Sequence, residues 1–274
     1  MHDESRWRLI LMPELDGATQ MAVDEAILDQ ASEDSFVPTL RLYSWKPGCL
    51  SLGYAQPVSD IDLAALEIAG WELVRRPTGG RAILHIDELT YAVILPLSHP
   101  VAAGSLIDSY QRLGQALLAS LNHLGCAPRS DAHYETPSGT RGKAPVCFEV
   151  PSNYEITADG KKLIGSAQAR RKNSLLQHGS LPLHGDLARI TQTLAVPDTE
   201  RQEAAERLLQ HATTLEGATG TVHSWNTAVE AFTHGFQSTF GIKFQIADLS
   251  EREQQRSQEL RRTKYTQREW NHRV

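Results

Sequence analysis

Cys147 is the cysteine whose place in the sequence best suits nucleophilic chemistry. It directly follows residues 127–146, a polar stretch rich in Pro, Gly and Ser. A free thiol has a pKa of about 8.5, so only a few per cent of it is the nucleophilic thiolate at pH 7. A nearby lysine in a partly buried site would lower that pKa, and each unit raises the thiolate fraction roughly tenfold. The other two cysteines, Cys49 and Cys126, stand beside apolar residues and are predicted to be small buried core residues.

Lys162 is the candidate for such a lysine, and it stands in the segment GKKLIGSAQ (160–168). The small side chains of Gly165, Ser166 and Ala167 leave room for a ligand and leave backbone N–H groups exposed to it. Such N–H groups can stabilise an oxyanion. A solvent-exposed lysine on a hairpin is the alternative, and the residues alone leave both interpretations open.

The segment RRPTGGRA (75–82) is a second candidate for ligand binding. Gly79 and Gly80 have no Cβ, so their backbone can approach a ligand closely. Arg76 beside exposed N–H groups suits a phosphate or a carbonyl oxygen. The spacing matches neither G-x-x-x-x-G-K-[ST] nor G-x-G-x-x-G, the common phosphate-binding loops. The alternative is a hairpin turn flanked by surface arginines, with WELVRR and RAILH as its strands.

His85 ends the strand that follows this turn. A single histidine on a strand is more often a hydrogen-bonded structural residue than a ligand. No H-E-x-x-H pattern, cysteine pair or His/carboxylate cluster at ligand spacing accompanies it. We therefore expect no metal site.

Strand-like and helix-like patterns alternate around these segments and predict a mixed α/β fold with antiparallel hairpins. The clearest helix covers 106–124, where apolar residues recur every three or four positions. Ser105 and Asp108 resemble a capping box at its start. The Asp-Gly pair at 159–160 suits a tight turn and predicts a hairpin. The segment SLLQHGSLPL (174–183) is expected to pair with that hairpin as the next strand.

The composition is that of a globular protein without a nucleic-acid or membrane partner. Lys and Arg number 27 against 33 Asp and Glu, a net charge of −6, whereas duplex-binding proteins usually carry a basic excess. Three cysteines without a C-x-x-C pair argue against a disulfide framework and for a reducing compartment. Residues 1–30 contain no signal-peptide pattern, and the longest apolar run, 91–97, is far shorter than the roughly 20 residues that span a bilayer. We expect a cytoplasmic protein.

The chain divides by composition into one domain over residues 1–247 and a charged helical tail over residues 248–274. The tail holds seven Lys and Arg against five Asp and Glu, with few apolar residues. That composition is typical of a solvated helix whose charges pair at a spacing of four residues.

Seven strings spread over almost the whole chain resemble the biotin/lipoate protein ligase family. They are QMAVDEA (20–26), RRPTGGRAILH (75–85), ELTYAV (88–93), PVCFEVPSNYEI (145–156), KKLIGSAQ (161–168), LQHGSL (176–181) and KYTQREWN (264–271). Within that family the chain is most similar to the single-domain octanoyl-[acyl carrier protein]:protein octanoyltransferase branch. The resemblance implies a biotin/lipoate ligase-like catalytic fold of the α+β type, with mixed sheets flanked by helices.

The resemblance also implies roles for individual residues. Cys147 matches the nucleophile that accepts the acyl group, and Lys162 matches the lysine common to the ligases and the transferases. Substrate-binding positions are matched by Arg76, Gly79, Gly80, His85, Gly165, Ser166, Ala167, His178 and Gly179. The family often has an acidic residue directly after the histidine, whereas here Ile86 follows and Asp87 comes one place later. The polar partner of His85 is therefore left open.

The implied reaction is a two-step acyl transfer that needs no ATP, metal or other cofactor. The Cys147 thiolate attacks the thioester of octanoyl-acyl carrier protein. A lysine of an apo lipoyl domain, on the glycine-cleavage H protein or a 2-oxoacid dehydrogenase E2 subunit, then takes the octanoyl group. Lys162 lowers the pKa of Cys147 and stabilises the oxyanion. Six basic residues near the site are candidates for docking the acidic carrier protein: Arg129, Arg141, Lys143, Arg170, Arg171 and Lys172.

Three alternatives stay open from the sequence. An ATP-dependent lipoate-protein ligase would use the same Gly-Gly turn and Lys162 to make an acyl adenylate, and would give Cys147 no role. An octanoyl amidotransferase between lipoyl proteins would use similar thioester chemistry with an amide donor. A non-catalytic acyl-binding or lipoyl-domain-binding module would form no covalent adduct. The family resemblance further implies a monomer.

Overall fold

The computed structural model describes residues 5–33, 35–131, 146 and 155–274 of the chain. Its elements follow in this order: β1 (Arg6–Leu15), α1 (Gly17–Gln30), β2 (Thr39–Trp45), β3 (Cys49–Leu52), η1 (Val58–Asp60), α2 (Leu63–Ile68), β4 (Glu72–Arg75), β5 (Ile83–His85), β6 (Glu88–Pro96), α3 (Leu106–His123), β7 (Arg129–Asp131), β8 (Glu155–Ala158), β9 (Lys161–Arg171), β10 (Ser174–Pro182), η3 (Leu187–Thr193), α4 (Asp198–His211), α5 (Leu215–Thr219), α6 (Trp225–Phe240), β11 (Lys243–Ile246), α7 (Glu251–Leu260), η4 (Arg261–Tyr265) and α8 (Arg268–Asn271). Within these ranges, no helix is both long and apolar enough to cross a bilayer.

An eight-stranded mixed sheet forms the centre of the molecule, with the strand order β11-β1-β2-β6-β10-β9-β8-β7. β1 pairs in parallel with β11 and β2, and the remaining pairs are antiparallel. The predicted hairpin is confirmed, because β8 and β9 pair around residues 159–160 and β10 follows as the next strand. The register sets His178 opposite Ala167 and Gly179 opposite Ser166. Two segments predicted to bind substrate thus lie side by side.

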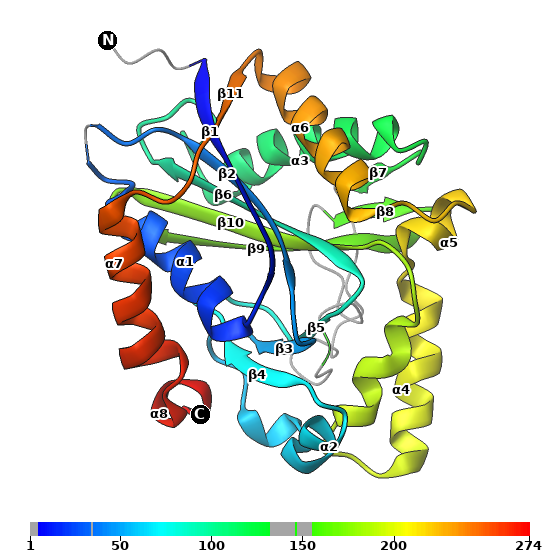
Figure 1. Ribbon diagram of the computed structural model, residues 1–274. Helices are drawn as coiled ribbons and strands as arrows, with labels where there is room; N and C mark the ends of the chain where they lie inside the picture. Colours follow the sequence, from blue (N-terminus) through cyan, green and yellow to red (C-terminus); the bar gives the residue numbers. More distant parts are fainter. Residues whose placement is uncertain (1–4, 34, 132–145, 147–154) are drawn as a thin grey trace.

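Helices cover both faces of this sheet (Figure 1). α3 and α6 pack on one face, over a core that includes Leu113 and Phe232. α1 covers the opposite face, where Met21 belongs to a second core. The predicted start of α3 is confirmed, since Ser105 and Asp108 form a capping box with reciprocal side chain–backbone hydrogen bonds. The resulting helix–sheet–helix layering confirms the predicted α+β class.

A second sheet of three strands, in the order β4-β3-β5, lies below the large sheet in Figure 1. α4 and η3 pack against it through a core that includes Leu50, Ile190 and Leu208. The interpretation of residues 75–82 as a hairpin turn with surface arginines is wrong, because the fully buried β3 lies between β4 and β5. The connection therefore crosses the end of β3, and Arg75 and Arg76 are buried.

The tail packs on the domain instead of lying in solvent. α7 runs beside α1 (Figure 1), and Glu253 of α7 is buried in an ion pair with Arg8 at 2.5 Å. Leu260, Tyr265 and Asn271 are buried as well. The prediction of a solvated helix is wrong because these few residues suffice to fix the segment, while most of its arginines stay at the surface. The domain boundary at residue 247 stays a prediction.

Candidate active site

A pocket lies between the large and the small sheet. It encloses an empty volume of about 410 Å³, a figure that includes its opening to solvent. Its walls come from α1, β2, β3, β5, β6, β9, β10 and the segment between β4 and β5. The lining residues are Met21, Tyr43, Trp45, Ser51, Arg76, Gly80, Ile83, His85, Thr90, Gly165, Ser166, Ala167, His178, Gly179 and Ser180.

Eight of the nine predicted substrate-binding residues line this pocket: Arg76, Gly80, His85, Gly165, Ser166, Ala167, His178 and Gly179. Gly79 is the exception, because it lines an open groove beside the pocket. The structure therefore brings three separate sequence segments into one concave site. Their individual roles toward a substrate stay predictions.

Gly179 and Gly53 allow neighbouring backbone segments to approach closely at the pocket wall. A Cβ added at Gly179 would lie 2.6 Å from the carbonyl oxygen of Gly165 and 2.6 Å from Cε1 of Tyr91. A Cβ added at Gly53 would overlap the carbonyl oxygen of Gly80. A side chain at either position would push the wall apart, so close backbone approach explains the glycines.

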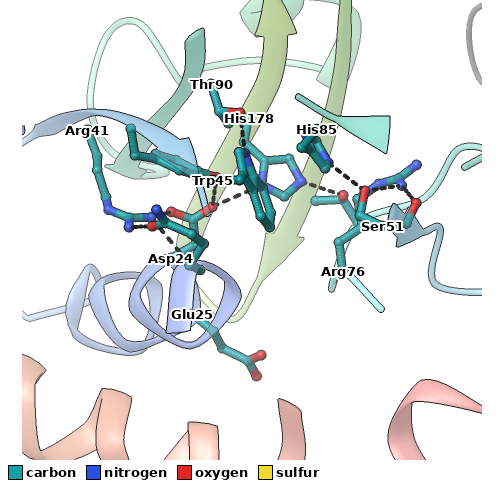
Figure 2. Close-up of polar contacts among 12 residues, drawn as sticks. Asp24, Glu25, Arg41, Trp45, Ser51, Arg76, His85, Thr90 and His178 are labelled. Carbon is teal, nitrogen blue, oxygen red and sulfur yellow. Dashed lines mark hydrogen bonds and ion pairs between the residues drawn. The ribbon is translucent and has the colours of Figure 1, made fainter. Parts of the chain in front are cut away.

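His178 belongs to a buried polar network behind the pocket (Figure 2). Its Nδ1 lies 3.0 Å from Oδ2 of Asp24, and its Nε2 lies 2.6 Å from Oγ1 of Thr78. Asp24 also pairs with Arg41 at 2.6 Å and accepts a hydrogen bond from the hydroxyl of Tyr43. The imidazole of His178 thereby links helix α1 to Thr78, in the segment between β4 and β5.

The charge state of Asp24 determines which ring nitrogen of His178 carries the proton. Burial alone would raise the pKa of the Asp24 carboxyl, but the charge of Arg41 and the hydrogen bond from His178 hold that pKa below its usual value. Burial lowers the pKa of His178 below its usual value in spite of Asp24. An ionised Asp24 can only accept, so Nδ1 of the neutral imidazole carries the proton. Nε2 therefore accepts from the Thr78 hydroxyl.

His85 lies on another wall of the pocket, between two polar partners. Its Nδ1 is 2.9 Å from Oε1 of Glu88, and its Nε2 is 2.8 Å from Oγ of Ser51. Glu88 is thus the partner that the sequence left open. Asp87 instead forms an ion pair with Arg189, at 2.8 Å.

Trp45 supplies an apolar wall whose polar edge is satisfied. Its ring stacks on His85 with the centroids 4.1 Å apart. Its Nε1–H donates to Oγ1 of Thr90 at 2.8 Å, and the hydroxyls of Thr90 and Ser180 donate to Glu88. The indole therefore lines the pocket without a buried unpaired N–H. Trp45 and Thr90 are labelled in Figure 2.

Arg76 shapes the glycine segment. Its guanidinium donates to the carbonyl oxygens of Ser51 (2.9 Å), Gly79 (2.8 Å) and Arg81 (2.7 Å). These bonds satisfy a buried cation with backbone dipoles and hold residues 79–81 around it. Arg76 thus lines the pocket and positions its rim.

The C-terminal segment contacts Arg75, the residue directly before Arg76 of the pocket lining. The backbone N–H of Arg75 donates to Oδ1 of Asn271 at 2.8 Å, and its Nη2 donates to the carbonyl oxygen of Asn271 at 2.9 Å. Nε1–H of Trp270 donates to the carbonyl oxygen of Arg75 at 2.9 Å. Arg75 also donates to the carbonyl oxygens of Gly53 and Gln56. The tail therefore anchors the end of β4, from which residues 76–80 continue.

Lys162 is buried, not exposed on a hairpin, and is absent from the described lining of the pocket. Its Nζ lies 2.6 Å from Oε1 of Glu155, and the two side chains are only 5% and 6% exposed. It stands on β9 three residues before Gly165, which does line the pocket. Such a buried ammonium requires a carboxylate partner, and Glu155 supplies it.

Cys147 lies outside the described residues, whereas its neighbour Val146 is described. Val146 is buried and forms a parallel β-bridge with Ala82, in the segment between β4 and β5. The prediction for the other two cysteines is confirmed, because Cys49 and Cys126 are buried free thiols. Burial raises the pKa of both thiols, which disfavours the reactive thiolate.

Asp24 and Arg41 are residues of the site that the sequence interpretation missed. Each is a charge inside an otherwise buried element, Asp24 in α1 and Arg41 in β2. A charge within a buried run must be paired, and this signal was available in QMAVDEA and TLRLYSW. The pairing partner lies on another element, so the local pattern could not name it.

The open groove beside the pocket, called here the arginine groove, shares Gly80 with it. Its lining is Tyr54, Ala55, Gln56, Pro77, Thr78, Gly79, Gly80, Arg81, Gln168, Ala169, Arg170 and Arg171. Two of the predicted docking residues, Arg170 and Arg171, thus lie beside the pocket mouth. Arg129 lies away from it on β7, at the far edge of the large sheet, and Arg141 and Lys143 lie outside the described residues.

The fold and the pocket together define a lipoate ligase-type catalytic domain. The lipoyl protein ligase A/B catalytic domain family matches residues 16–237, and the chain belongs to this family. Two solved structures share the fold with a TM-score of 0.80 and 26% identity each. One is a bipartite lipoate protein ligase from Thermoplasma acidophilum, with 97% of this chain and 96% of that chain covered. The other is lipoate-protein ligase A bound with ATP, with 97% and 98% covered.

The named relatives point to one branch of this family. The chain is 40% identical over 273 residues to octanoyltransferase LipM of Moorella thermoacetica, which covers 96% of this chain and 97% of the relative. It is 36% identical over 272 residues to octanoyltransferase LipM of Carboxydothermus hydrogenoformans, with 96% and 97% covered. Octanoyltransferase LipM of Kyrpidia tusciae is 38% identical over 275 residues, with 97% and 98% covered.

Proposed function

We propose that this chain is a cytoplasmic octanoyltransferase that moves an octanoyl group from acyl carrier protein to a lysine of an apo lipoyl domain. The observation that carries the proposal is the pocket in which eight predicted substrate-binding residues meet. The similarity to proteins named octanoyltransferase LipM supports it. The acceptors are lipoyl domains of the glycine-cleavage H protein and of 2-oxoacid dehydrogenase E2 subunits, and the product starts lipoate assembly.

The first step exchanges one thioester for another. The Cys147 thiolate attacks the carbonyl carbon of the octanoyl thioester, and a C–S bond forms. The bond to the phosphopantetheine sulfur breaks, and that sulfur leaves as a thiolate that takes up a proton. Because the bond formed and the bond broken are of the same kind, this step needs neither ATP nor a cofactor.

The second step makes an amide. The unprotonated lysine amine of the lipoyl domain attacks the carbonyl carbon of S-octanoyl Cys147, and a C–N bond forms while the C–S bond to Cys147 breaks. The amine loses one proton to the solvent, and the Cys147 thiolate is regenerated. The Lys162 ammonium favours that thiolate and the oxyanions of both steps, together with backbone N–H groups near Gly165 and Ser166.

The pocket suits a linear acyl chain. Met21, Trp45 and Ile83 contribute apolar surface to its lining. At about 0.8 kcal/mol per buried CH₂, seven carbons beyond the carbonyl contribute roughly 5 kcal/mol. Burial lowers the pKa of His178, which favours the uncharged imidazole in the wall that holds the chain.

A transfer assay separates this proposal from its alternatives. The protein is mixed with an apo lipoyl domain and with octanoyl-acyl carrier protein, free octanoate with ATP, or a lipoyl domain that is already octanoylated. We expect transfer from the carrier protein without ATP. Transfer from octanoate with ATP alone would identify a ligase, and transfer from the octanoylated lipoyl domain alone would identify an amidotransferase. A protein that transfers from none of the three would be a binding module.

A further inference from the structure

The last residues of the chain form a basic surface in an otherwise acidic protein. Residues 261–274 contain five basic residues and one acidic residue, whereas the whole chain has a net charge of −6. The basic residues are Arg261, Arg262, Lys264, Arg268 and Arg273. Seven residues of this segment line an open hollow: Arg262, Thr263, Lys264, Gln267, Glu269, Trp270 and Arg273. We call it the C-terminal hollow.

The pocket, the arginine groove and the C-terminal hollow adjoin one another, and together they are called here the path. Gly80 lines both the pocket and the arginine groove. At another part of that groove, Tyr54 lies under the guanidinium of Arg273, which is 4.1 Å from the ring centroid. Arg273 lines the C-terminal hollow as well. Pocket, arginine groove and hollow are therefore neighbours in that order.

Part of the positive charge along this path is uncompensated. Within the described part of the chain, no carboxylate lies at ion-pair distance from Arg262, Arg268 or Arg273. Arg170 donates to the carbonyl oxygens of Ala102, Gly104 and Ser105. Other cations here are paired: Arg171 and Lys264 with Glu25, Arg261 with Asp16, and Arg81 with Asp60. A surface with surplus positive charge attracts an acidic partner.

We propose that the arginine groove and the C-terminal hollow together form the docking surface for the acidic acyl carrier protein that donates the octanoyl group. This inference rests on the proposed function. The donor presents its thioester at the end of an arm with a phosphodiester, and arginine binds phosphate oxygens well. The acceptor presents a lysine, whose cationic form these arginines repel. The charges along the path therefore favour the donor over the acceptor.

Two donors separate docking from chemistry. One is octanoyl-acyl carrier protein, and the other is S-octanoyl-N-acetylcysteamine, a small uncharged thioester that needs no docking surface. The variant is Arg262→Glu with Arg273→Glu, because both side chains line the C-terminal hollow. We expect kcat/KM for the carrier protein to fall about tenfold or more, since charges at an interface rim govern the association rate. The value for the small donor should stay within about twofold of the parent.

The matched control carries the same change in charge elsewhere. Arg207→Glu with Arg252→Glu alters two exposed arginines on α4 and α7, which pair with Glu203 and Glu33 at the surface. Neither lines the groove or the hollow. We expect this control to keep at least half of the parent kcat/KM for the carrier protein, because surface ion pairs contribute little.

Three results would overturn the docking proposal. They are an unchanged kcat/KM for the carrier protein, an equal loss with both donors, and a slower second step with the lipoyl domain alone, which would assign the surface to the acceptor. Each of them leaves the proposed function standing, because the parent protein still transfers octanoyl from the small donor. A parent that transfers from neither donor would contradict the proposed function itself.

Discussion

Thr78 and His178 stand a hundred residues apart in the sequence, yet Oγ1 of the threonine lies 2.6 Å from Nε2 of the histidine. The contact joins the segment between β4 and β5 to β10 of the large sheet. Asp24 stands behind the imidazole and sets which nitrogen carries the proton. The hydrogen-bonded chain Thr78–His178–Asp24 therefore connects two walls of the pocket, the segment between β4 and β5 and strand β10.

Removing the charge of Asp24 should destabilise the protein strongly. In Asp24→Asn, the fully buried Arg41 loses its carboxylate, and breaking a buried pair by removing one partner typically costs about 3–5 kcal/mol. Urea unfolding of the variant and the parent measures this difference. The matched control is Asp29→Asn, which removes a partly exposed partner of Arg256 from the same helix and should cost at most about 1 kcal/mol. Equal losses in the two variants would contradict the role of the buried pair.

The stability of the protein should fall as the pH drops below neutrality, and His178 should cause part of that fall. The pKa of His178 is lowered in the folded state. At a pH near or below the ordinary histidine pKa of about 6.5, the unfolded chain therefore binds more protons than the folded protein. Protonation therefore favours unfolding as the pH falls from about 7 towards the folded pKa. His178→Asn keeps a donor for Asp24 and removes this titration. Melting temperatures between about pH 7 and pH 5 should show a smaller slope for the variant, and an identical slope would refute this assignment.

The contact between the tail and Arg75 should govern substrate binding as well as stability. Asn271→Ala leaves the buried N–H of Arg75 without its acceptor, and such a group costs about 1–3 kcal/mol. Trp270→Phe keeps an aromatic ring and removes the hydrogen bond to the Arg75 carbonyl. We expect both variants to bind octanoate more weakly in calorimetry, because residues 76–80 start from this strand end. Variants that melt lower but bind octanoate like the parent would show that the tail is a stabilising element only.

The close approach of Gly53 to Gly80 should make a methyl group costly there. Gly53→Ala places a Cβ against the carbonyl oxygen of Gly80, so the rim of the pocket must move. We expect slower octanoyl transfer and a lower melting temperature. Gly114→Ala is the control, because its Cβ meets nothing within 4 Å and a helical Ala is favoured over Gly by about 1 kcal/mol. A Gly53→Ala enzyme with parental transfer rates would contradict this reading of the rim.

Local patterns predicted the elements of the site well. The capping box at Ser105, the Asp-Gly turn at 159–160 and the pairing of β9 with β10 depend on neighbours in sequence. The chemistry of the glycine-rich and small-residue segments identified five of the fifteen lining residues, and the family resemblance added His85, His178 and Gly179. These features are encoded within a few residues, and a single sequence reveals them.

Features that depend on distant partners were not predicted. The place of β3 between β4 and β5 depends on which buried strand fills the centre of the small sheet. The burial of the tail depends on contacts such as Lys264 and Tyr265 with Glu25, which lie far away in sequence. The partner of His85 was missed because Glu88, rather than the adjacent Asp87, faces the ring. In each case the local composition is compatible with more than one arrangement, and tertiary packing selects one.

The acylation of Cys147 is tested most directly by the intact mass of the protein after incubation with octanoyl-acyl carrier protein, without acceptor and without ATP. We expect the mass of one added octanoyl group, released by hydroxylamine and located by peptide mapping on Cys147. The adduct should be absent from Cys147→Ser and formed more slowly in Lys162→Ala. Octanoylation of a lipoyl domain by Cys147→Ser at the parental rate, or an adduct that persists in that variant, would contradict the proposed nucleophile.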